Sequence, residues 1–216
     1  MGIIKQGILG GFSGKVGNVV GASWKGIDYI RSLPSSVSNP RTVGQVRQRT
    51  KFSLVQGFLT GLTPIIRVGF QKFTGKQSAY NAAMSYNVLN GIVGEGSDVE
   101  LDYPSLLISR GNLFPAPDVE VIHNDGDFLF EWDNMLAGNA TLKDTATLLM
   151  YNKTKGESQY SMGLFSRATG EASQVIPATW KGDTVECYVG FVSEDGKEVS
   201  NSIYAGSVET PEFVSF

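Results

Sequence analysis

The spacing of hydrophobic residues changes near residue 97, from a helical period to a two-residue period. This change restricts the chain to folds that contain both helices and antiparallel strands. After residue 97 the chain alternates apolar and polar residues in short runs, which are separated by Gly, Asp, Asn and Ser. Such runs are typical of antiparallel β-sandwiches. We therefore expect an α+β protein whose second half is a sandwich of roughly seven strands.

The runs themselves indicate where the strands lie. The first, DVEVIHNDGDFLFEW, alternates around an Asn-Asp-Gly turn, which is a strong hairpin signal. The others are TATLLMYNKT, QYSMGLFSR, ASQVIPATW, DTVECYVGFV and EVSNSIYAGSV. Trp132 and Trp180 are expected to be core or edge anchors. We expect an Ig/fibronectin-like arrangement of these strands.

Helix signals lie between residues 42 and 91. Thr42 and Gln45 are spaced as a capping box, and a helix is expected to run from there to about Gly61. Thr63-Pro64 restarts a second helix, and KQSAYNAAMSYNVLNG predicts a third with apolar residues on two sides. We expect the first helix to bury a stripe of four residues: Phe52, Val55, Leu59 and Leu62.

The segment GGFSGKVGNVVG precedes these helices and is rich in glycine. A phosphate-binding P-loop is excluded, because Val16 follows Gly14-Lys15 and Leu9 stands where the first glycine is required. The run KVGNVVGASW instead predicts a strand that turns at Lys25-Gly26 into IDYIRSL. Its glycines mark bulges or close backbone contacts. The strand either twists within its own sheet or pairs with a neighbouring subunit through Gly14, Lys15, Val16, Gly17, Val19, Val20 and Gly21.

Charge is distributed unevenly along the chain. Residues 1–97 carry 11 Lys and Arg against two acids, whereas residues 98–216 carry 7 against 19. We therefore expect two domains, a basic hairpin and helical region over 1–97 and an acidic sandwich over 98–216. The glycine-containing segment from Gly91 to Asp98 is the expected linker.

The segment NPRTVGQVRQRTK concentrates the basic charge. Arg41, Arg47, Arg49 and Lys51 occur here without a nearby acid, and only Val46 offers an apolar anchor over residues 44–51. We expect the basic side chains at this end of the helix either to face solvent or to contact an anion. The anion is nucleic-acid phosphate or an acidic protein face.

Signatures of catalysis or metal binding are absent from the sequence. The chain has one cysteine, Cys187, and one histidine, His123, and we expect structural roles for both. The acids Asp125, Asp127, Glu131 and Asp133 lack the EF-hand pattern and predict a solvated strand face. We expect no enzyme activity, no cofactor and no metal. No signal peptide or membrane span is indicated, so we expect cytoplasmic synthesis without membrane insertion.

Two long motifs resemble those of an uncharacterised family that is widespread in Bacteroidota. They are GGFSGKVGNVVGASWKGIDYIRSLP and NPRTVGQVRQRTKF, which are similar to the family pattern GKVG-x-VVG-x-x-WKG followed by NPRT-x-x-Q-x-x-QR-x-(K/R)F. The region from YNKTKGESQY to EVSNSIYAGSV is similar to the family's second half. This family has no accepted active site, so the resemblance implies little about function.

Three functions remain open at this stage. The first is a structural subunit of an assembly, such as a phage-type virion, whose partners are copies of itself or other subunits. The second is binding of the nucleic-acid backbone by the basic half. The third is a ligand- or carbohydrate-binding sandwich that uses Trp132, Trp180 or Tyr160.

Overall fold

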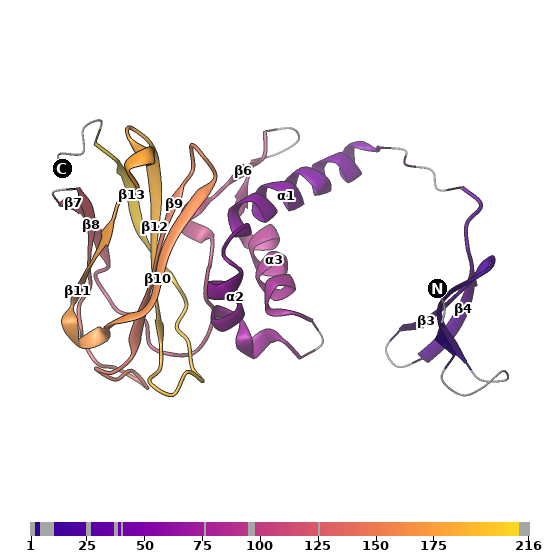
Figure 1. Cartoon of the computed structure of the whole chain (residues 1–216), viewed down its shortest axis with the longest axis horizontal. Coiled ribbons are helices and arrows are strands. Elements are labelled where there is room, and N and C mark those ends of the chain that lie inside the picture. Colours follow the sequence, from indigo (N-terminus) through magenta and orange to yellow (C-terminus); the bar gives the residue numbers. More distant parts are fainter. Residues whose placement is uncertain are drawn as a thin grey trace. The chain divides into compact units, whose positions relative to one another are not determined.

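The computed structural model describes residues 3–4, 11–24, 27–36, 39, 41–75, 77–94, 98–124 and 126–211. The chain forms two compact units, Met1–Thr42 and Val43–Phe216. Helices and strands of each unit are labelled in Figure 1.

The larger unit contains the expected β-sandwich, built from two antiparallel sheets. The four-stranded sheet has the order β10-β9-β12-β13, and the three-stranded sheet has the order β11-β8-β7. The strands are β7 (Glu120–Asn124), β8 (Asp127–Glu131), β9 (Thr145–Asn152), β10 (Glu157–Ser166), β11 (Glu171–Val175), β12 (Thr184–Val192) and β13 (Ile203–Glu209). Each of the runs expected from the sequence therefore contains a strand. The Asp125 position of the first turn lies outside the described residues.

A hydrophobic core fills the space between the two sheets. Phe128 and Phe130 of the smaller sheet are buried against residues of the larger sheet that include Leu148 and Met150. Both sandwich tryptophans belong to this core, with exposed fractions of 4% for Trp132 and 2% for Trp180. Their expected role as anchors agrees with this burial.

Three helices cover the opposite face of the larger sheet (Figure 1). They are α1 (Val43–Leu59), α2 (Thr63–Gly69) and α3 (Ala79–Asn90). Phe58 of α1 packs edge-on against Tyr151, with ring centroids 4.9 Å apart, and also contacts Tyr188. The helices and the sheet therefore share a second hydrophobic core.

The strands β9 and β12 lie between the two cores and contribute side chains to both. Leu149 of β9 faces the helices, whereas its neighbours Leu148 and Met150 face the smaller sheet. In β12, Tyr188 faces the helices and Cys187 faces the smaller sheet. This double burial explains why both strands consist of nearly continuous apolar runs.

The two compact units do not meet at residue 97, where the sequence predicted the domain boundary. The compact units divide between Thr42 and Val43, because the helices pack on the sheet of the second half. The segment expected to be a linker contributes β5 (Ile92–Val93), which pairs with β6 (Glu100–Leu101). Residues 95–97 of that segment lie outside the described residues.

The helix boundaries agree with the sequence signals to within a few residues. The first helix begins directly after Thr42, and Ser78 caps α3 by accepting a hydrogen bond from the Asn81 amide at 3.1 Å. The second starts at Thr63 itself, with Leu62 in the cap position. One residue of the expected buried stripe of α1 is wrongly placed, because Phe52 is 47% exposed.

Short 3-10 helices complete the larger unit. They are η1 (Gln71–Phe73), η2 (Tyr103–Ser105), η3 (Arg167–Thr169) and η4 (Ala178–Trp180). The segment between η2 and β7 is held to the helices by Asn87 of α3. This buried amide donates to the Leu107 carbonyl at 2.9 Å and accepts from the Leu107 amide at 2.8 Å.

The smaller unit is a sheet with the order β1-β2-β3-β4. Its strands are β1 (Ile3–Ile4), β2 (Phe12–Val16), β3 (Val19–Trp24) and β4 (Ile27–Ser32). The run KVGNVVGASW is not one strand, because the chain turns at Gly17-Asn18, where Gly17 has φ of 57°. The expected turn at Lys25-Gly26 lies outside the described residues, although its flanking strands β3 and β4 do pair.

A buried ion pair lies in the larger unit, where η3 follows β10. Nε of Arg167 contacts Oδ2 of Asp144 at 3.2 Å, with both side chains at most 1% exposed. The guanidinium also donates to the Phe114 carbonyl at 2.7 Å and lies 4.1 Å from the Phe191 ring centroid. Burial lowers the pKa of Arg167, and the charge and hydrogen bond of Asp144 oppose that change.

Removing one member of this pair leaves a buried charge without its partner. We expect Asp144→Ala to lower the free energy of unfolding by about 3–5 kcal/mol. Lys143→Ala is the control, because it breaks the exposed Lys143–Glu194 pair and should cost roughly 0–1 kcal/mol. Urea denaturation of both variants measures the difference. Equal losses for the two variants would contradict the account of the buried pair.

Candidate functional site

The four-stranded sheet of the smaller unit carries the glycine-rich motif. Gly14, Lys15 and Val16 of β2 pair with Gly21, Val20 and Val19 of β3. On its other side β3 pairs with β4 over its whole length. The backbone of Val19, Val20 and Gly21 is therefore already paired on both sides within the chain, which leaves no edge there for a neighbouring subunit.

Gly21 meets a steric requirement at the centre of this sheet. A Cβ atom placed there would lie 2.0 Å from the Phe12 carbonyl oxygen. Gly14 of β2 pairs with Gly21 and has φ of 97°, and the Phe12 carbonyl just before it lies close to Gly21. The glycines therefore permit a close backbone approach inside the chain, as one of the two sequence interpretations predicted.

Strand β4 forms an open edge of this sheet. It pairs with β3, and no further strand of the described part of the chain pairs with it. All six of its residues are exposed. The exposed fractions of Ile27 and Ile30 are 64% and 63%, and that of Tyr29 is 44%. An exposed edge strand with three large apolar side chains, next to the charged Asp28 and Arg31, is a surface on which another strand can add.

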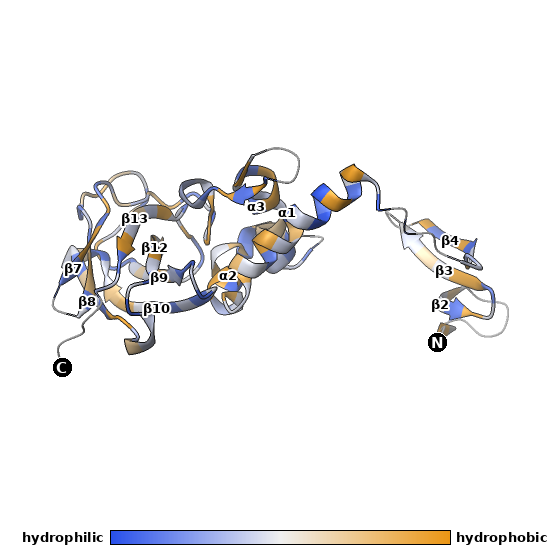
Figure 2. Ribbon diagram, turned by 90° about the horizontal axis from the view of Figure 1, so that it is seen from above, coloured by the Kyte–Doolittle hydropathy of each residue, from blue (hydrophilic) through white to orange (hydrophobic). Residues whose placement is uncertain are grey.

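The unit has no hydrophobic core among its described residues. Gly21 is buried, but every described apolar side chain of β2, β3 and β4 is at least partly exposed. The hydrophobic colouring along β3 and β4 is visible in Figure 2. Since Ile27 and Ile30 alternate onto opposite faces of β4, burial of one face would leave the other in water.

The basic segment lies mostly in the first turns of α1, where Arg49 is exposed and Arg47 and Lys51 are half-buried. Arg41 precedes the helix with φ of 49°, and Arg47, Arg49 and Lys51 lie within its first turns. Burial in α1 begins only at Val55. The spacing of Arg47 and Lys51 places them on one side of the helix. No ion pair joins either residue to a carboxylate in the described part of the chain.

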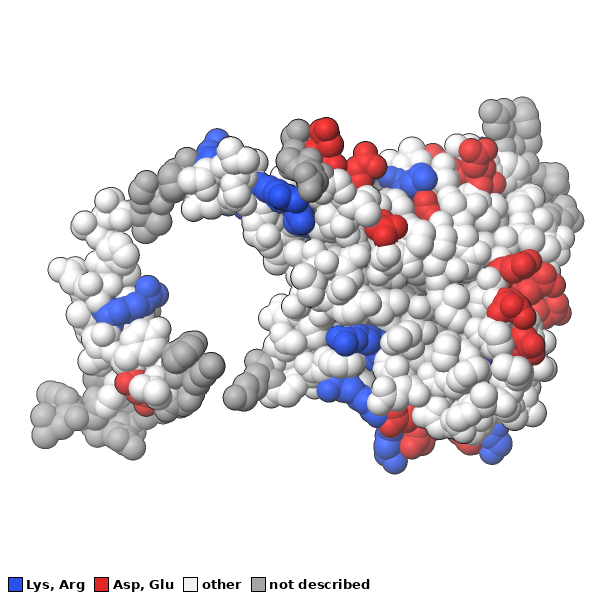
Figure 3. Space-filling view, turned by 180° about the vertical axis from the view of Figure 1, so that it is seen from behind, with Lys and Arg blue, Asp and Glu red and all other residues white. Residues whose placement is uncertain are grey.

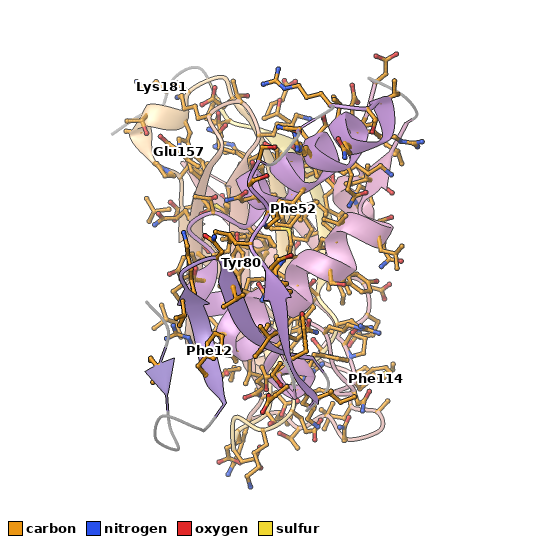
Figure 4. The ribbon with its side chains drawn as sticks, turned by 90° about the vertical axis from the view of Figure 1, so that its right-hand side faces the viewer. Phe12, Phe52, Tyr80, Phe114, Glu157 and Lys181 are labelled. Atoms are coloured by element: carbon orange, nitrogen blue, oxygen red, sulfur yellow. The ribbon has the colours of Figure 1, made fainter. Side chains whose placement is uncertain are left out.

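An apolar groove of about 560 Å³ runs between α1 and α3. Phe52 and Tyr80 line it from the two helices and are labelled in Figure 4. Leu89 at the far end of α3 is 81% exposed and lines the same groove, and Lys51 contributes a charge. Phe52 is exposed in this groove, which the sequence did not indicate.

Acidic residues gather on the outer face of the smaller sandwich sheet (Figure 3). Glu131 of β8 lies directly opposite Glu120 of β7 and Glu171 of β11, so three exposed carboxylates form a row across the sheet. Like charges in such pairs repel. Asp127 also lies on this sheet, where it accepts a hydrogen bond from Ser173 at 2.9 Å. Of the residues expected on a solvated strand face, Glu131 is exposed in β8, Asp127 is half-buried, and Asp133 is exposed but follows the end of the strand.

The residues proposed for ligand recognition are not arranged as a binding platform. Trp132 and Trp180 are buried, and their indole nitrogens donate to the Arg167 carbonyl and to Glu157 at 3.0 and 2.8 Å. Tyr160 packs against the core shared by the helices and the sheet. Two buried aromatic faces cannot stack on a sugar, which removes the structural basis of that hypothesis.

A polar cluster lies around the buried Glu186 of β12. Its carboxylate contacts Lys153 Nζ at 2.9 Å and accepts hydrogen bonds from the hydroxyls of Tyr204 and Ser207 at 2.6 and 3.2 Å. Burial, with a smaller contribution from Tyr151 and Glu186, raises the pKa of the nearby Tyr103 to about 12. Every partner in the cluster is satisfied, so we interpret the cluster as structural.

The single cysteine and the single histidine each lie beside residues of the sandwich. Cys187 is fully buried between the sheets, and burial raises the pKa of its thiol. His123 of β7 is exposed and packs edge-on against Phe128, with ring centroids 6.3 Å apart. Within the described ranges, no three His, Cys, Asp or Glu side chains come together as metal ligands. None of the described helices is long and apolar enough to span a bilayer.

Comparison with known proteins places most of the chain in one family. Residues 11–206 match the model of a family described as "Family of unknown function (DUF6266)". No protein of curated function matches the chain in sequence.

Similar solved structures cover about half of the chain. A fibronectin type III domain of the human collagen alpha-1(XX) chain is 10% identical and has a TM-score of 0.36, covering 46% of this chain and 87% of that chain. The FN5 domain of Drosophila Lar is 16% identical and has a TM-score of 0.33, covering 47% of this chain and 97% of that chain.

Proposed function

The chain belongs to the DUF6266 family, whose function is unknown, and we propose that it is a non-enzymatic structural subunit of a multi-subunit assembly. A phage-type virion is one example of such an assembly. The partners would be further copies of the chain or other subunits. The observation that carries this proposal is the sheet of the smaller unit, whose strand β4 is an open edge with three exposed apolar side chains and whose described residues form no hydrophobic core.

A sheet of this kind needs a partner for stability. Units below roughly 40 residues usually require disulfides, metals or oligomerisation, and the smaller unit, Met1–Thr42, is close to that size. The chain has a single cysteine, which excludes an internal disulfide. Sheets become stable when their apolar face is covered or when further strands extend them. Association supplies both kinds of contact.

The edge of β4 is the contact that we assign to a second copy of the chain. Addition of a strand to an open edge satisfies the free backbone groups and covers the side chains beside them. Ile30 would then be buried between two copies. The groove between α1 and α3 and the acidic row on the smaller sandwich sheet are further surfaces suited to contacts between subunits.

Light scattering on the purified full chain tests the proposal. We expect a mass above the 23.3 kDa of a single chain, and we expect Ile30→Lys to shift the mass toward that value. A lysine on an apolar edge blocks strand addition because its charge would lose water.

Val175→Lys is the matched control for this experiment. Val175 is a strand residue of the sandwich that is 67% exposed, compared with 63% for Ile30, and it lies outside the smaller unit. The control should keep the mass of the unchanged chain. A single-chain mass for the unchanged protein at high concentration would overturn the proposal.

Binding of nucleic acid is the second candidate, and the basic, partly exposed first turns of α1 favour it. Contacts from Arg47 and Lys51 would go to phosphate, so affinity should depend on salt and little on sequence. Against this candidate, the net charge of the chain is −3. The acidic face of the sandwich would also repel a polyanion.

A gel-shift series across salt concentrations separates the two candidates. If the chain binds nucleic acid, a shift seen at roughly 50 mM salt should weaken steeply as salt rises. The double variant Arg47→Glu/Lys51→Glu should then lose the shift, whereas Ile30→Lys should keep it. Absence of any shift at low salt would eliminate nucleic-acid binding and leave the assembly role.

A further inference from the structure

A second pocket of the larger unit contains a positive charge without a counter-ion. It has a volume of about 360 Å³ and lies between α3 and the segment that includes η1. Arg110 supplies the charge. The other residues that line the pocket are aromatic, aliphatic or neutral polar. The lining residues include Phe73, Gln77, Ser85, Tyr86, Asn90 and Arg110.

Two aromatic rings hold the Arg110 guanidinium in place. Its central carbon lies 4.5 Å from the ring centroid of Phe73 and 4.9 Å from that of Tyr86. A guanidinium stacked in this way keeps its N–H groups directed outward in its own plane. The stacking limits rotation of the side chain, so little conformational freedom is lost when those N–H groups bind a partner.

The backbone that carries Arg110 is also held rigidly. The Arg110 amide donates to the Gly69 carbonyl at 2.9 Å, and the Gly111 amide donates to Asn201 at 3.1 Å. Gly69 is packed so closely that a Cβ atom there would lie 2.4 Å from the Ile108 carbonyl oxygen. Such support from several elements keeps a binding side chain in position.

The guanidinium has no anionic partner among the described residues. None of the ion pairs includes Arg110, whereas the buried Arg167 is neutralised by Asp144. No acidic residue lines the pocket, and the amides of Gln77 and Asn90 and the Ser85 hydroxyl do. Arg110 is partly exposed, so a ligand can reach it from solvent.

From this arrangement we infer that the pocket binds a carboxylate on a small ligand with an apolar body. The flat, oriented fork of Arg110 matches the two oxygens of a carboxylate. Phe73 and Tyr86, together with Leu89 at the pocket edge, contact the apolar body. The site is separate from the edge of β4 and does not depend on the assembly role.

Titration of the full chain with benzoate tests the inference. The readout is the NMR resonance of the Arg110 Nε–H group, which responds to a carboxylate on the guanidinium. We expect a saturable shift with benzoate and none with benzamide, which has the same ring and shape but no charge. Acetate, a carboxylate with a minimal apolar body, should bind more weakly than benzoate.

Variants show whether the geometry of Arg110 matters as well as its charge. Arg110→Lys keeps the charge but loses the planar fork, and its benzoate affinity, followed on the Gln77 side-chain resonances, should fall about tenfold or more. Gln77→Glu places a carboxylate of nearly the same shape beside Arg110 and should compete with the ligand to a similar extent. Arg67→Lys, an exposed arginine of α2 outside this pocket, is the control and should bind benzoate normally.

The outcomes decide the inference in either direction. Loss of binding in both pocket variants, with folded spectra and an unchanged control, supports the site. Absence of a saturable shift, an equal shift with benzamide, or full affinity in Gln77→Glu would overturn it. Gln77 lies outside the helices and strands and is exposed, so its substitution tests the site even if Arg110→Lys alters local packing.

Discussion

The burial of β9 and β12 on both faces is the constraint on which the larger unit depends. Leu148 and Cys187 face one core, and Leu149 and Tyr188 face the other. Neither core could form alone, because removal of the helices would expose one face of the sheet and removal of the smaller sheet would expose the other. The helices and the sandwich therefore form one folding unit, in spite of their opposite charges.

The sequence predicted the seven strands of the sandwich well, because each lies in an alternating or continuous apolar run bounded by turn residues. It also placed the helices, since Thr42 and Pro64 mark the beginnings of the first two and the apolar pattern of KQSAYNAAMSYNVLNG indicates the third. The division between units was not predictable from charge, because charge reports on the surface and the division depends on packing. The exposure of Phe52 was also not predictable, because the periodicity of a helix does not show where the sheet that it packs on ends.

The candidate surfaces were only partly predictable for the same reason. The glycine-rich motif indicated close backbone contact, and the structure locates that contact between Gly21 and Phe12 within the chain. Among the described strands β4 is an open edge of the sheet, and the sequence indicated it as one strand of a hairpin. Arg110 carried no sequence signal at all, because its aromatic partners Phe73 and Tyr86 come from different elements.

The chain thus has a well-packed larger unit and a small sheet whose described residues form no hydrophobic core. The larger unit contains two hydrophobic cores, whereas the sheet exposes apolar residues on both faces of β4. We propose that copies of the chain associate through this sheet. The basic beginning of α1 and the acidic sandwich face would add charge contacts whose strength falls with salt.

Hydrogen exchange of the β4 amides as a function of protein concentration tests this claim most directly. Residues 27–32 lie on an open edge, so their exchange reports whether another strand has been added. The account predicts that these amides become more protected as concentration rises, while the amides of β9 and β12 stay equally protected throughout. Protection of residues 27–32 that does not change with concentration would contradict it.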